Sequence, residues 1–218
     1  MPSRNDLHQY QNRMIDFIYN TPKCAVWAGL GLGKTITTLT AITDLLDSLT
    51  VCKVLIIAPL RVANSVWHTE AKRWTHTKDL TFSIVTGSEK ERISALFKSA
   101  DIYVINRENV QWLVEHYKTK WPYDLVVIDE SSSFKSASSQ RFKALKKVRT
   151  LTDRMVQLTG TPSPNGLIDV WSQMFLLDGG ERLGKTISAY KMRFFQTGHN
   201  GYTLTPVNNA DKIIHRLI

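Results

Sequence analysis

The sequence of 218 residues contains only two cysteines, Cys24 and Cys52. Both stand in apolar surroundings where strands are expected to begin, which favours buried free thiols over a disulfide framework. No apolar run reaches the roughly 18 residues that a membrane span requires. The polar N-terminus (residues 2–6) lacks the charged-then-apolar order of a signal peptide. We therefore expect an intracellular, reduced protein with no membrane partner.

Acidic residues are too few to balance the basic ones. The chain has 28 Lys and Arg against 19 Asp and Glu, so its formal net charge is +9. Contacts to phosphate are made by basic side chains, and such an excess suits a polyanionic partner. Nucleic acid is the expected partner on this ground, and a merely solvated basic surface is the alternative.

Short apolar runs alternate with helical patterns along the chain. The runs are rich in Val and Ile and carry few charges, which is typical of strands covered on both faces of a parallel sheet. The predicted strands are Ala25–Ala28, Val54–Ala58, Phe82–Val85, Ile102–Ile105, Leu125–Ile128 and Met155–Leu158. Apolar residues recur at three- and four-residue steps between them, most clearly over Thr35–Leu49. We expect an α/β fold, an open, mostly parallel sheet with helices on both faces.

Three segments fall outside this alternation. The serine-rich stretch Ser131–Ser139 predicts a loop, and the polar stretch Gln196–Asn209, with Gly198 and Gly201, predicts a surface hairpin or loop. The apolar-basic pattern Ile213–Arg216 predicts a helix that continues past the last residue.

The tripeptide Gly-Lys-Thr occurs twice. The stretch Gly179–Thr186 fits the strict pattern of Gly, four residues and Gly-Lys-Thr, whereas Ala28–Thr35 begins with Ala. A phosphate loop needs a strand before it and a helix after it, so that free amides and the positive helix end face the phosphates. Only Ala28–Thr35 has both in the predicted structure, and the other stretch carries Glu181, which would repel phosphate. We therefore predict phosphate binding at Ala28–Thr35 and a glycine-capped turn at Gly179–Thr186.

Each position of the first stretch has an expected role. Lys34 is expected to reach the β- and γ-phosphates of ATP, and the Thr35 hydroxyl to ligate Mg²⁺. Glycines let the backbone approach phosphate closely. The loop itself is made of Gly29, Leu30, Gly31, Leu32 and Gly33. A glycine-rich turn without a ligand is the alternative interpretation.

Two carboxylates follow the most apolar of the predicted strands. Leu125–Ile128 ends in Asp129 and Glu130, and ligands of open α/β sheets bind at the carboxyl ends of the strands. Asp129 suits a Mg²⁺ ligand, and Glu130 suits a group that orients or deprotonates the attacking water. Such a pair alone is usually a turn, but its presence after a phosphate loop favours the catalytic interpretation.

These features together resemble the first lobe of superfamily-two helicases and translocases, most closely the Swi/Snf-type ATPases. The matching motifs cover nearly the whole chain in order: Leu7, Tyr10 and Gln11; Ala28–Thr35; Ala58–Leu60 with Trp67, Glu70 and Trp74; Ile105–Arg107; Asp129–Glu130; and Leu158–Pro162 with Asn165, Leu167 and Trp171. The resemblance implies that residues 1–218 form a RecA-like lobe. It also implies ATP and Mg²⁺ as cofactors and nucleic acid, expected to be duplex DNA, as the partner.

The resemblance assigns three further roles. Gln11, next to Tyr10, is expected to read adenine, since its amide can both donate and accept. The residues expected to contact the nucleic-acid backbone are Pro59, Arg61, Asn106 and Arg107. The turn expected to couple the nucleotide state to nucleic acid consists of Thr159, Gly160 and Thr161.

The sequence departs from the family's pattern at two points. Ser131 and Ser132 follow the Asp-Glu pair where relatives commonly carry Ala or Gly and then His or Asp, which leaves open how the pair connects to Thr159–Thr161. The motifs of the second lobe, with its arginine finger, are absent, and a second RecA-like lobe is expected as the partner, normally in the same chain. Trp67 and the other helical tryptophans are interpreted as core residues rather than base-stacking platforms.

Two other function classes remain open at this level. A phosphate-loop kinase of small molecules would explain the loop and Asp129, but neither Gln11 nor Leu158–Pro162. A non-catalytic basic module that binds nucleic acid would explain the charge, but not the retention of Lys34, Thr35 and the acidic pair. DNA-stimulated hydrolysis of ATP would distinguish a motor from a small-molecule kinase. Binding of ATP would distinguish a motor from a non-catalytic module.

Overall fold

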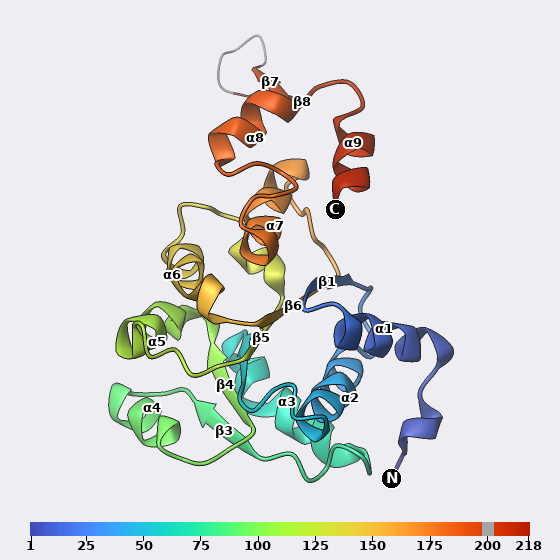
Figure 1. Ribbon diagram of the computed structural model, residues 1–218, viewed down its shortest axis with the longest axis vertical. Coiled ribbons are helices and arrows are strands. Elements are labelled where there is room, and N and C mark those ends of the chain that lie inside the picture. Colours follow the sequence, from blue (N-terminus) through green and yellow to red (C-terminus); the bar gives the residue numbers. More distant parts are fainter. Residues whose placement is uncertain (198–202) are drawn as a thin grey trace.

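The computed structural model describes residues 1–197 and 203–218. A sheet of six strands lies at its centre, in the order β1-β6-β5-β2-β4-β3 (Figure 1). The strands are β1 (Lys23–Trp27), β2 (Val54–Ala58), β3 (Phe82–Val85), β4 (Ile102–Asn106), β5 (Leu125–Asp129) and β6 (Arg154–Thr159). Every pairing within the sheet is parallel. The predicted α/β fold is confirmed, and each strand matches its predicted run to within two residues at either end.

Helices cover both faces of the sheet. The helices are α1 (Gln9–Asn20), α2 (Lys34–Asp47), α3 (Leu60–Arg73), α4 (Glu89–Leu96), α5 (Val110–Tyr117), α6 (Gln140–Val148), α7 (Val170–Asp178), α8 (Ile187–Phe194) and α9 (Ala210–Leu217). Successive side chains of a strand point to opposite faces. In β2, Val54 and Ile56 join one apolar core with α1–α3, whereas Leu55 and Ile57 join the other with α4–α7. The continuous apolar strand is therefore explained by two covered faces.

The C-terminal part of the chain stands beyond α7, at the top of Figure 1. It consists of α8, a small antiparallel pair formed by β7 (Phe195–Thr197) and β8 (Leu204–Pro206), and α9. The pair agrees with the predicted hairpin over Gln196–Asn209, of which Gly198 and Gly201 lie outside the described residues. The predicted helical pattern Ile213–Arg216 forms part of α9.

One expectation about burial was wrong. Cys52 is an exposed free thiol, whereas Cys24 is buried as predicted. The serine-rich stretch Ser131–Ser139 is a loop from Lys135 onward, as predicted, whereas Ser131–Phe134 forms a 3₁₀ turn with Ser131 and Phe134 buried. The burial of this turn has a physical reason. Phe134 is the single aromatic residue of the stretch, and its ring joins the core and holds the polar residues around it close to the sheet.

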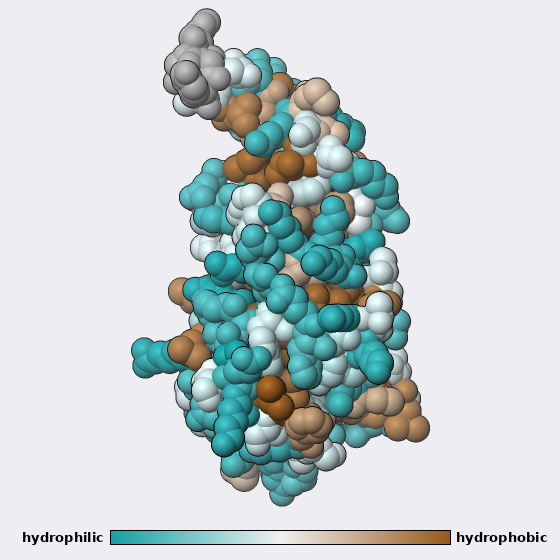
Figure 2. All heavy atoms as spheres, turned by 90° about the vertical axis from the view of Figure 1, so that its left-hand side faces the viewer, coloured by the Kyte–Doolittle hydropathy of each residue, from teal (hydrophilic) through white to brown (hydrophobic). Residues whose placement is uncertain are grey.

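The surface over α4, α5 and α6 is mostly hydrophilic, with small apolar areas between the polar ones (Figure 2). Lys143, Lys146 and Lys147 of α6 are exposed there. In the part of the chain that the structure describes, no helix has the length and apolar character needed to cross a bilayer.

Candidate active site

The parallel strands bring three functional segments to one edge of the sheet. The segment Ala28–Gly33 follows β1 and ends where α2 begins at Lys34. The strand-loop-helix context predicted for the phosphate loop is therefore present. The Asp-Glu pair ends β5, and the Thr159–Thr161 turn ends β6, whose neighbours in the sheet are β1 and β5. Segments more than a hundred residues apart in sequence thus meet around one site.

Gln11 lies directly against the phosphate loop. A Cβ atom placed on Gly33 would approach Gln11 Nε2 to 2.3 Å, and Gly33 has a φ of +72°, so any other residue here would strain the backbone and displace the Gln11 amide. Gln11 is buried, and its Oε1 accepts a hydrogen bond from the His8 backbone N–H at 2.9 Å. Tyr10 is exposed, and its ring stacks on that of His8. The structure therefore places Gln11 at the base of the loop and Tyr10 at the surface beside it.

A hollow of about 370 Å³ lies between the phosphate loop, α3 and the end of β5. The predicted residues that line it are Leu30, Gly31, Gly33, Lys34, Thr35, Asp129 and Glu130. The Lys34 ammonium donates hydrogen bonds to the carbonyls of Ala28 (2.7 Å) and Gly29 (2.9 Å) at the rim of the loop. Glu70 of α3 lines it as well. The hollow thus combines a cation, a hydroxyl and three carboxylates, the kinds of group that bind a nucleoside triphosphate with a divalent metal ion.

The Asp129 carboxylate is held by a buried indole. Trp67 of α3 is fully buried, and its Nε1–H donates to Asp129 Oδ2 at 3.1 Å. Burial of the carboxyl raises the pKa of Asp129 to about 6, although the hydrogen bond from Trp67 favours the ionised form. A nearby cation would favour the ionised form of such a buried carboxyl group. In the described residues no three His, Cys, Asp or Glu are placed to hold a metal ion alone. Asp129 and Thr35 both line the hollow and are the residues predicted to hold Mg²⁺, together with phosphate oxygens.

Glu130 adopts an unusual backbone conformation. Its φ of 56° and ψ of 59° lie in the left-handed region, which costs free energy for a residue with a Cβ atom. The Ser133 N–H donates to the Glu130 carbonyl at 2.9 Å, so the 3₁₀ turn that follows maintains this conformation. The turn redirects the chain directly after β5 and leaves Glu130 on the lining of the hollow.

The Thr159–Thr161 turn touches the phosphate loop. The Ala28 N–H donates to the Thr159 carbonyl at 3.2 Å, and a Cβ atom on Gly160 would lie 3.4 Å from the Ala28 carbonyl oxygen. The Thr159 hydroxyl, fully buried, accepts from the Thr161 N–H at 3.1 Å. A shift of either segment would therefore displace the other.

The residues expected to contact nucleic acid lie at two adjacent strand ends. Ala58 pairs with Asn106 in the β2-β4 register, so Pro59 and Arg107 begin neighbouring segments. Arg61 is exposed on the first turn of α3, and its backbone carbonyl accepts from the Ser65 hydroxyl at 2.9 Å. The Asn106 amide donates to Glu108, and Arg107 forms an ion pair with the same carboxylate at 3.0 Å. The structure brings the four residues to one edge, where Asn106 and Arg107 have intramolecular partners.

Comparison with known proteins identifies the family. The SNF2-related domain matches residues 10–204, about nine tenths of the chain. This chain belongs to the SNF2-related domain family. The relatives include putative protein p41 of Acyrthosiphon pisum secondary endosymbiont phage 1, which is 41% identical over 86% of this chain and 42% of its own length. The DNA excision repair protein ERCC-6-like of Mus musculus is 29% identical over 86% of this chain and 16% of its own.

Solved structures agree with this assignment. The Sulfolobus solfataricus SWI2/SNF2 ATPase core in complex with dsDNA superposes with a TM-score of 0.77 over 98% of this chain and 43% of that one, at 24% identity. The ATPase core domain from the same organism gives a TM-score of 0.66 at 26% identity, over 87% of this chain and 38% of that one. The SNF2-related domain described here spans less than half the length of these proteins. The RecA-like fold and the Swi/Snf-type resemblance inferred from the motifs are both confirmed.

The second Gly-Lys-Thr stretch of the SNF2-related domain has a different structure. Gly179, with a φ of +71°, caps the end of α7, as predicted for a glycine-capped turn. No strand precedes the stretch, but α8 does follow it, with Thr186 as its N-cap, so the expectation that it lacked a helix was wrong. Lys185 is exposed and donates to the Gly179 carbonyl at 3.4 Å. A helix alone therefore does not make this stretch a phosphate loop.

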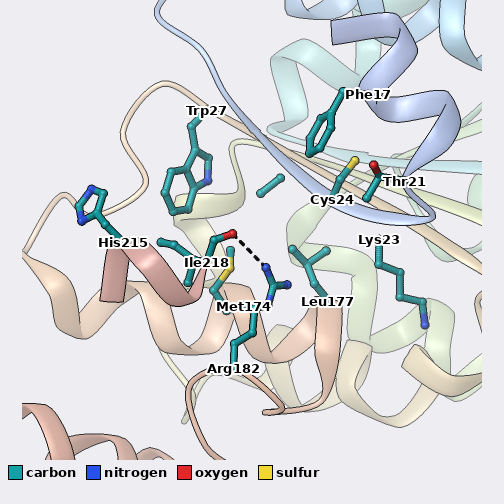
Figure 3. A pocket seen from close by; sticks show the side chains of 11 residues that line it. Phe17, Thr21, Lys23, Cys24, Trp27, Met174, Leu177, Arg182, His215 and Ile218 are labelled. Atoms are coloured by element: carbon teal, nitrogen blue, oxygen red, sulfur yellow. Dashed lines mark hydrogen bonds between the residues drawn. The ribbon is translucent and has the colours of Figure 1, made fainter. Parts of the chain in front are cut away.

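A separate cavity of about 450 Å³ lies between α1, β1, α7 and the end of α9 (Figure 3). Phe17, Trp27 and Met174 line it together with Lys23 and Arg182, and no carboxylate side chain does. The Arg182 guanidinium donates to the backbone carbonyl of Ile218 at 3.2 Å. This cavity shares no residue with the hollow at the phosphate loop and is not the candidate active site.

Sequence reasoning missed two residues of the site. Trp67 is a core residue as predicted, but its indole N–H also holds Asp129, and no sequence pattern indicates that contact. Gln173 is fully buried in α7 and hydrogen-bonds to Ser131. A signal for Gln173 existed, because it interrupts the apolar run Val170–Leu177 with an amide that must find partners when buried.

The raised pKa of Asp129 predicts that Asp129→Asn stabilises the metal-free domain above pH 6. The native state binds the Asp129 proton more tightly than the unfolded chain does, so Asp129 makes stability fall as the pH rises from about 4 to about 6. A pKa of about 6 against the ordinary 3.8 corresponds to at most about 3 kcal/mol at pH 7.5. Urea unfolding with EDTA at pH 4.5 and pH 7.5 measures the gain.

The matched control is the exposed Asp79. Asp79→Asn should change the free energy of unfolding by no more than about 0.5 kcal/mol at either pH. An Asp129→Asn variant whose stability relative to the native domain is the same at both pH values would contradict the predicted burial penalty.

Proposed function

We propose that this SNF2-related domain is the ATP-binding lobe of a DNA-dependent ATPase, a helicase or duplex translocase that couples Mg-ATP hydrolysis to movement on nucleic acid. The observation that carries the proposal is the convergence of the phosphate loop, the Asp-Glu pair and the Thr159–Thr161 turn at one edge of the sheet. A nucleotide site alone would need only the first two. The Thr159–Thr161 turn packs against the phosphate loop and would link bound nucleotide to bound nucleic acid.

Each residue of the hollow has a chemical role in this proposal. Lys34 leaves the Ala28 and Gly29 carbonyls to contact the β- and γ-phosphates, and the amides at the start of α2 add further donors. The Thr35 hydroxyl and the Asp129 carboxylate would hold Mg²⁺. When bound, Mg²⁺ neutralises the charge on the phosphate oxygens. Glu130 orients the attacking water and accepts its proton.

DNA is the proposed polymer partner. The net charge of +9 supports binding to a polyanion, and a structural neighbour was solved in complex with dsDNA. The proposed contacts to the sugar-phosphate backbone come from the ends of β2 and β4, through Pro59, Arg61, Asn106 and Arg107. A second RecA-like lobe would close the hollow from the other side and supply an arginine to the γ-phosphate.

Nucleotide choice tests the role of Gln11. We expect ATP to bind more tightly than GTP, and Gln11→Ala to reduce that preference by about tenfold, the equivalent of one net hydrogen bond of about 1.4 kcal/mol. Competition binding with ATP and GTP measures the ratio, and thermal unfolding checks that the variant remains folded. The exposed neighbour Gln9 provides the control, since Gln9→Ala should leave the ratio unchanged. Equal binding of ATP and GTP by the native domain would remove the basis for this assignment.

Hydrolysis by residues 1–218 alone tests the motor proposal. Among the residues that the structure describes, no arginine lines the hollow, and an arginine supplied from another element is worth about 10³–10⁵ in turnover. We expect the domain to bind ATP, to bind duplex DNA weakly and with strong salt dependence, and to hydrolyse ATP very slowly. Steady-state assays with and without DNA at two salt concentrations measure all three. Rapid DNA-stimulated turnover by the domain alone would show that no second lobe is needed.

A further inference from the structure

A cluster of buried polar groups lies where α7 meets the ends of β5 and β6. All residues of α7 from Val170 to Leu177 are buried, and Ser172 and Gln173 are fully so. Burying an amide costs free energy unless its donors and acceptor are all paired. An apolar side chain at position 173 would pack against the sheet without this cost. The presence of glutamine therefore calls for a reason other than the stability of the core.

The side chain of Gln173 connects three segments. Its Oε1 accepts from the Ser131 hydroxyl at 2.8 Å. Its Nε2 donates to the backbone carbonyls of Pro162 at 2.6 Å and Asp169 at 3.0 Å. Only one orientation of the amide is possible, because the reversed one would place its oxygen against two carbonyl oxygens. The Ser131 hydroxyl thus supplies the donor that the fixed Gln173 oxygen needs.

The connected segments carry the chemistry and the coupling of the site. Ser131 directly follows Glu130, and Pro162 directly follows the Thr159–Thr161 turn. The backbone of α7 is itself held to β6, because the Gln157 side chain donates to the Gln173 carbonyl at 2.8 Å. In Figure 1, α7 lies beside the ends of these strands. A displacement of the turn can therefore reach Glu130 through a single side chain.

We propose that Gln173 and Ser131 are positioning residues that link the Thr159–Thr161 turn to Glu130 and so make water activation respond to nucleic acid. This inference rests on the proposed function. The backbone strain at Glu130 makes its carboxylate sensitive to the position of the next residue. The Ser131 hydroxyl holds that residue to Gln173, which in turn is held to Pro162. In this chain Ser131 and Ser132 follow the Asp-Glu pair. The proposed connection from Ser131 through Gln173 to Pro162 is what joins that pair to the Thr159–Thr161 turn.

The test is a double-mutant cycle in the complete ATPase, with the second lobe present. Ser131→Ala removes the hydroxyl, and Gln173→Met replaces the amide by an apolar side chain of similar length. Neither residue lines the nucleotide hollow, so the affinity for Mg-ATP should stay within about twofold of the native value. DNA-stimulated kcat should fall by about 10- to 100-fold, the effect of misplacing a catalytic group by about 1 Å. The double variant should be no slower than the slower single variant, because both changes break one connection.

Ser133→Ala is the matched control. Ser133 lies in the same 3₁₀ turn, and its buried hydroxyl has no hydrogen-bond partner in the described part of the chain, so the change should leave kcat unaltered. A purely structural role predicts a different pattern. If the role were only structural, the double variant, in which Ser131→Ala and Gln173→Met leave both side chains apolar, would recover the melting temperature and kcat that each single variant lost. That result, or native kcat in both single variants, would overturn the inference. A native ATPase that DNA does not stimulate would instead overturn the proposed function.

Discussion

Lys34→Ala should reduce the affinity for Mg-ATP by about 100-fold. The Lys34 ammonium begins α2 at the rim of the hollow, and removing it forfeits a charge-assisted contact to phosphate worth about 3 kcal/mol. The fold should survive, because within the described ranges 1–197 and 203–218 the ammonium hydrogen-bonds only to the Ala28 and Gly29 carbonyls of a partly exposed loop. Calorimetric titration with ATP and Mg²⁺ measures the loss.

Lys185→Ala is the control for this experiment. Lys185 occupies the same position in the second Gly-Lys-Thr stretch, but it is exposed and follows the C-terminal end of a helix rather than a strand. Its removal should leave the affinity within about twofold of the native value. If Lys185→Ala were the damaging change and Lys34→Ala harmless, the choice of phosphate loop would be wrong.

Glu130→Gln should lower the turnover of the complete ATPase by about 10²–10⁴, the range for loss of a general base. The amide keeps the size of the carboxylate and can still orient water, but it cannot accept the proton at neutral pH. Affinity for Mg-ATP should remain within about threefold, because Asp129 and Thr35 hold the metal ion in the proposed mechanism. Single-turnover hydrolysis and equilibrium binding, measured side by side, separate the two quantities.

Glu115→Gln controls for the loss of a negative charge. Glu115 lies exposed on α5, accepts a hydrogen bond from Gln111 and is absent from the lining of the hollow. Turnover should be unchanged in that variant. A parallel loss of binding and turnover in Glu130→Gln would indicate that Glu130 supports the structure of the site, through the strained turn after β5, rather than the chemical step.

The sheet and the phosphate loop could be predicted because their signals are local. The run Val54–Ala58 contains no polar residue, and a strand of that composition must be covered on both faces. The loop Ala28–Thr35 was preferred over a stricter pattern match because a strand precedes it and a helix follows it. The order of the strands was not predicted, since it depends on pairings between residues such as Val26 and Leu158 that lie far apart in the chain.

The residues around the Asp-Glu pair show where local signals end. The composition of Ser131–Ser139 is that of a loop, yet Phe134 enters the core and Ser131 is fully buried. The positive φ of Glu130 is unusual for a residue with a side chain, and no preference of glutamate predicts it. Both features follow from the way the chain after β5 packs under α7. The exposure of Cys52 was missed for the same reason, because an apolar context does not say which way one side chain points.

The order and spacing of the motifs determined the family, the fold class and the candidate nucleotide residues of this protein, because each motif pairs a local backbone form with the side chains that its chemistry needs. The tertiary structure alone decided how those motifs act on one another. The contact of Trp67 with Asp129 joins residues 62 positions apart, and the contact of Ser131 with Gln173 joins residues 42 apart. Such pairs depend on the packing of helices against a sheet, where a shift of one residue along either element would replace the partner.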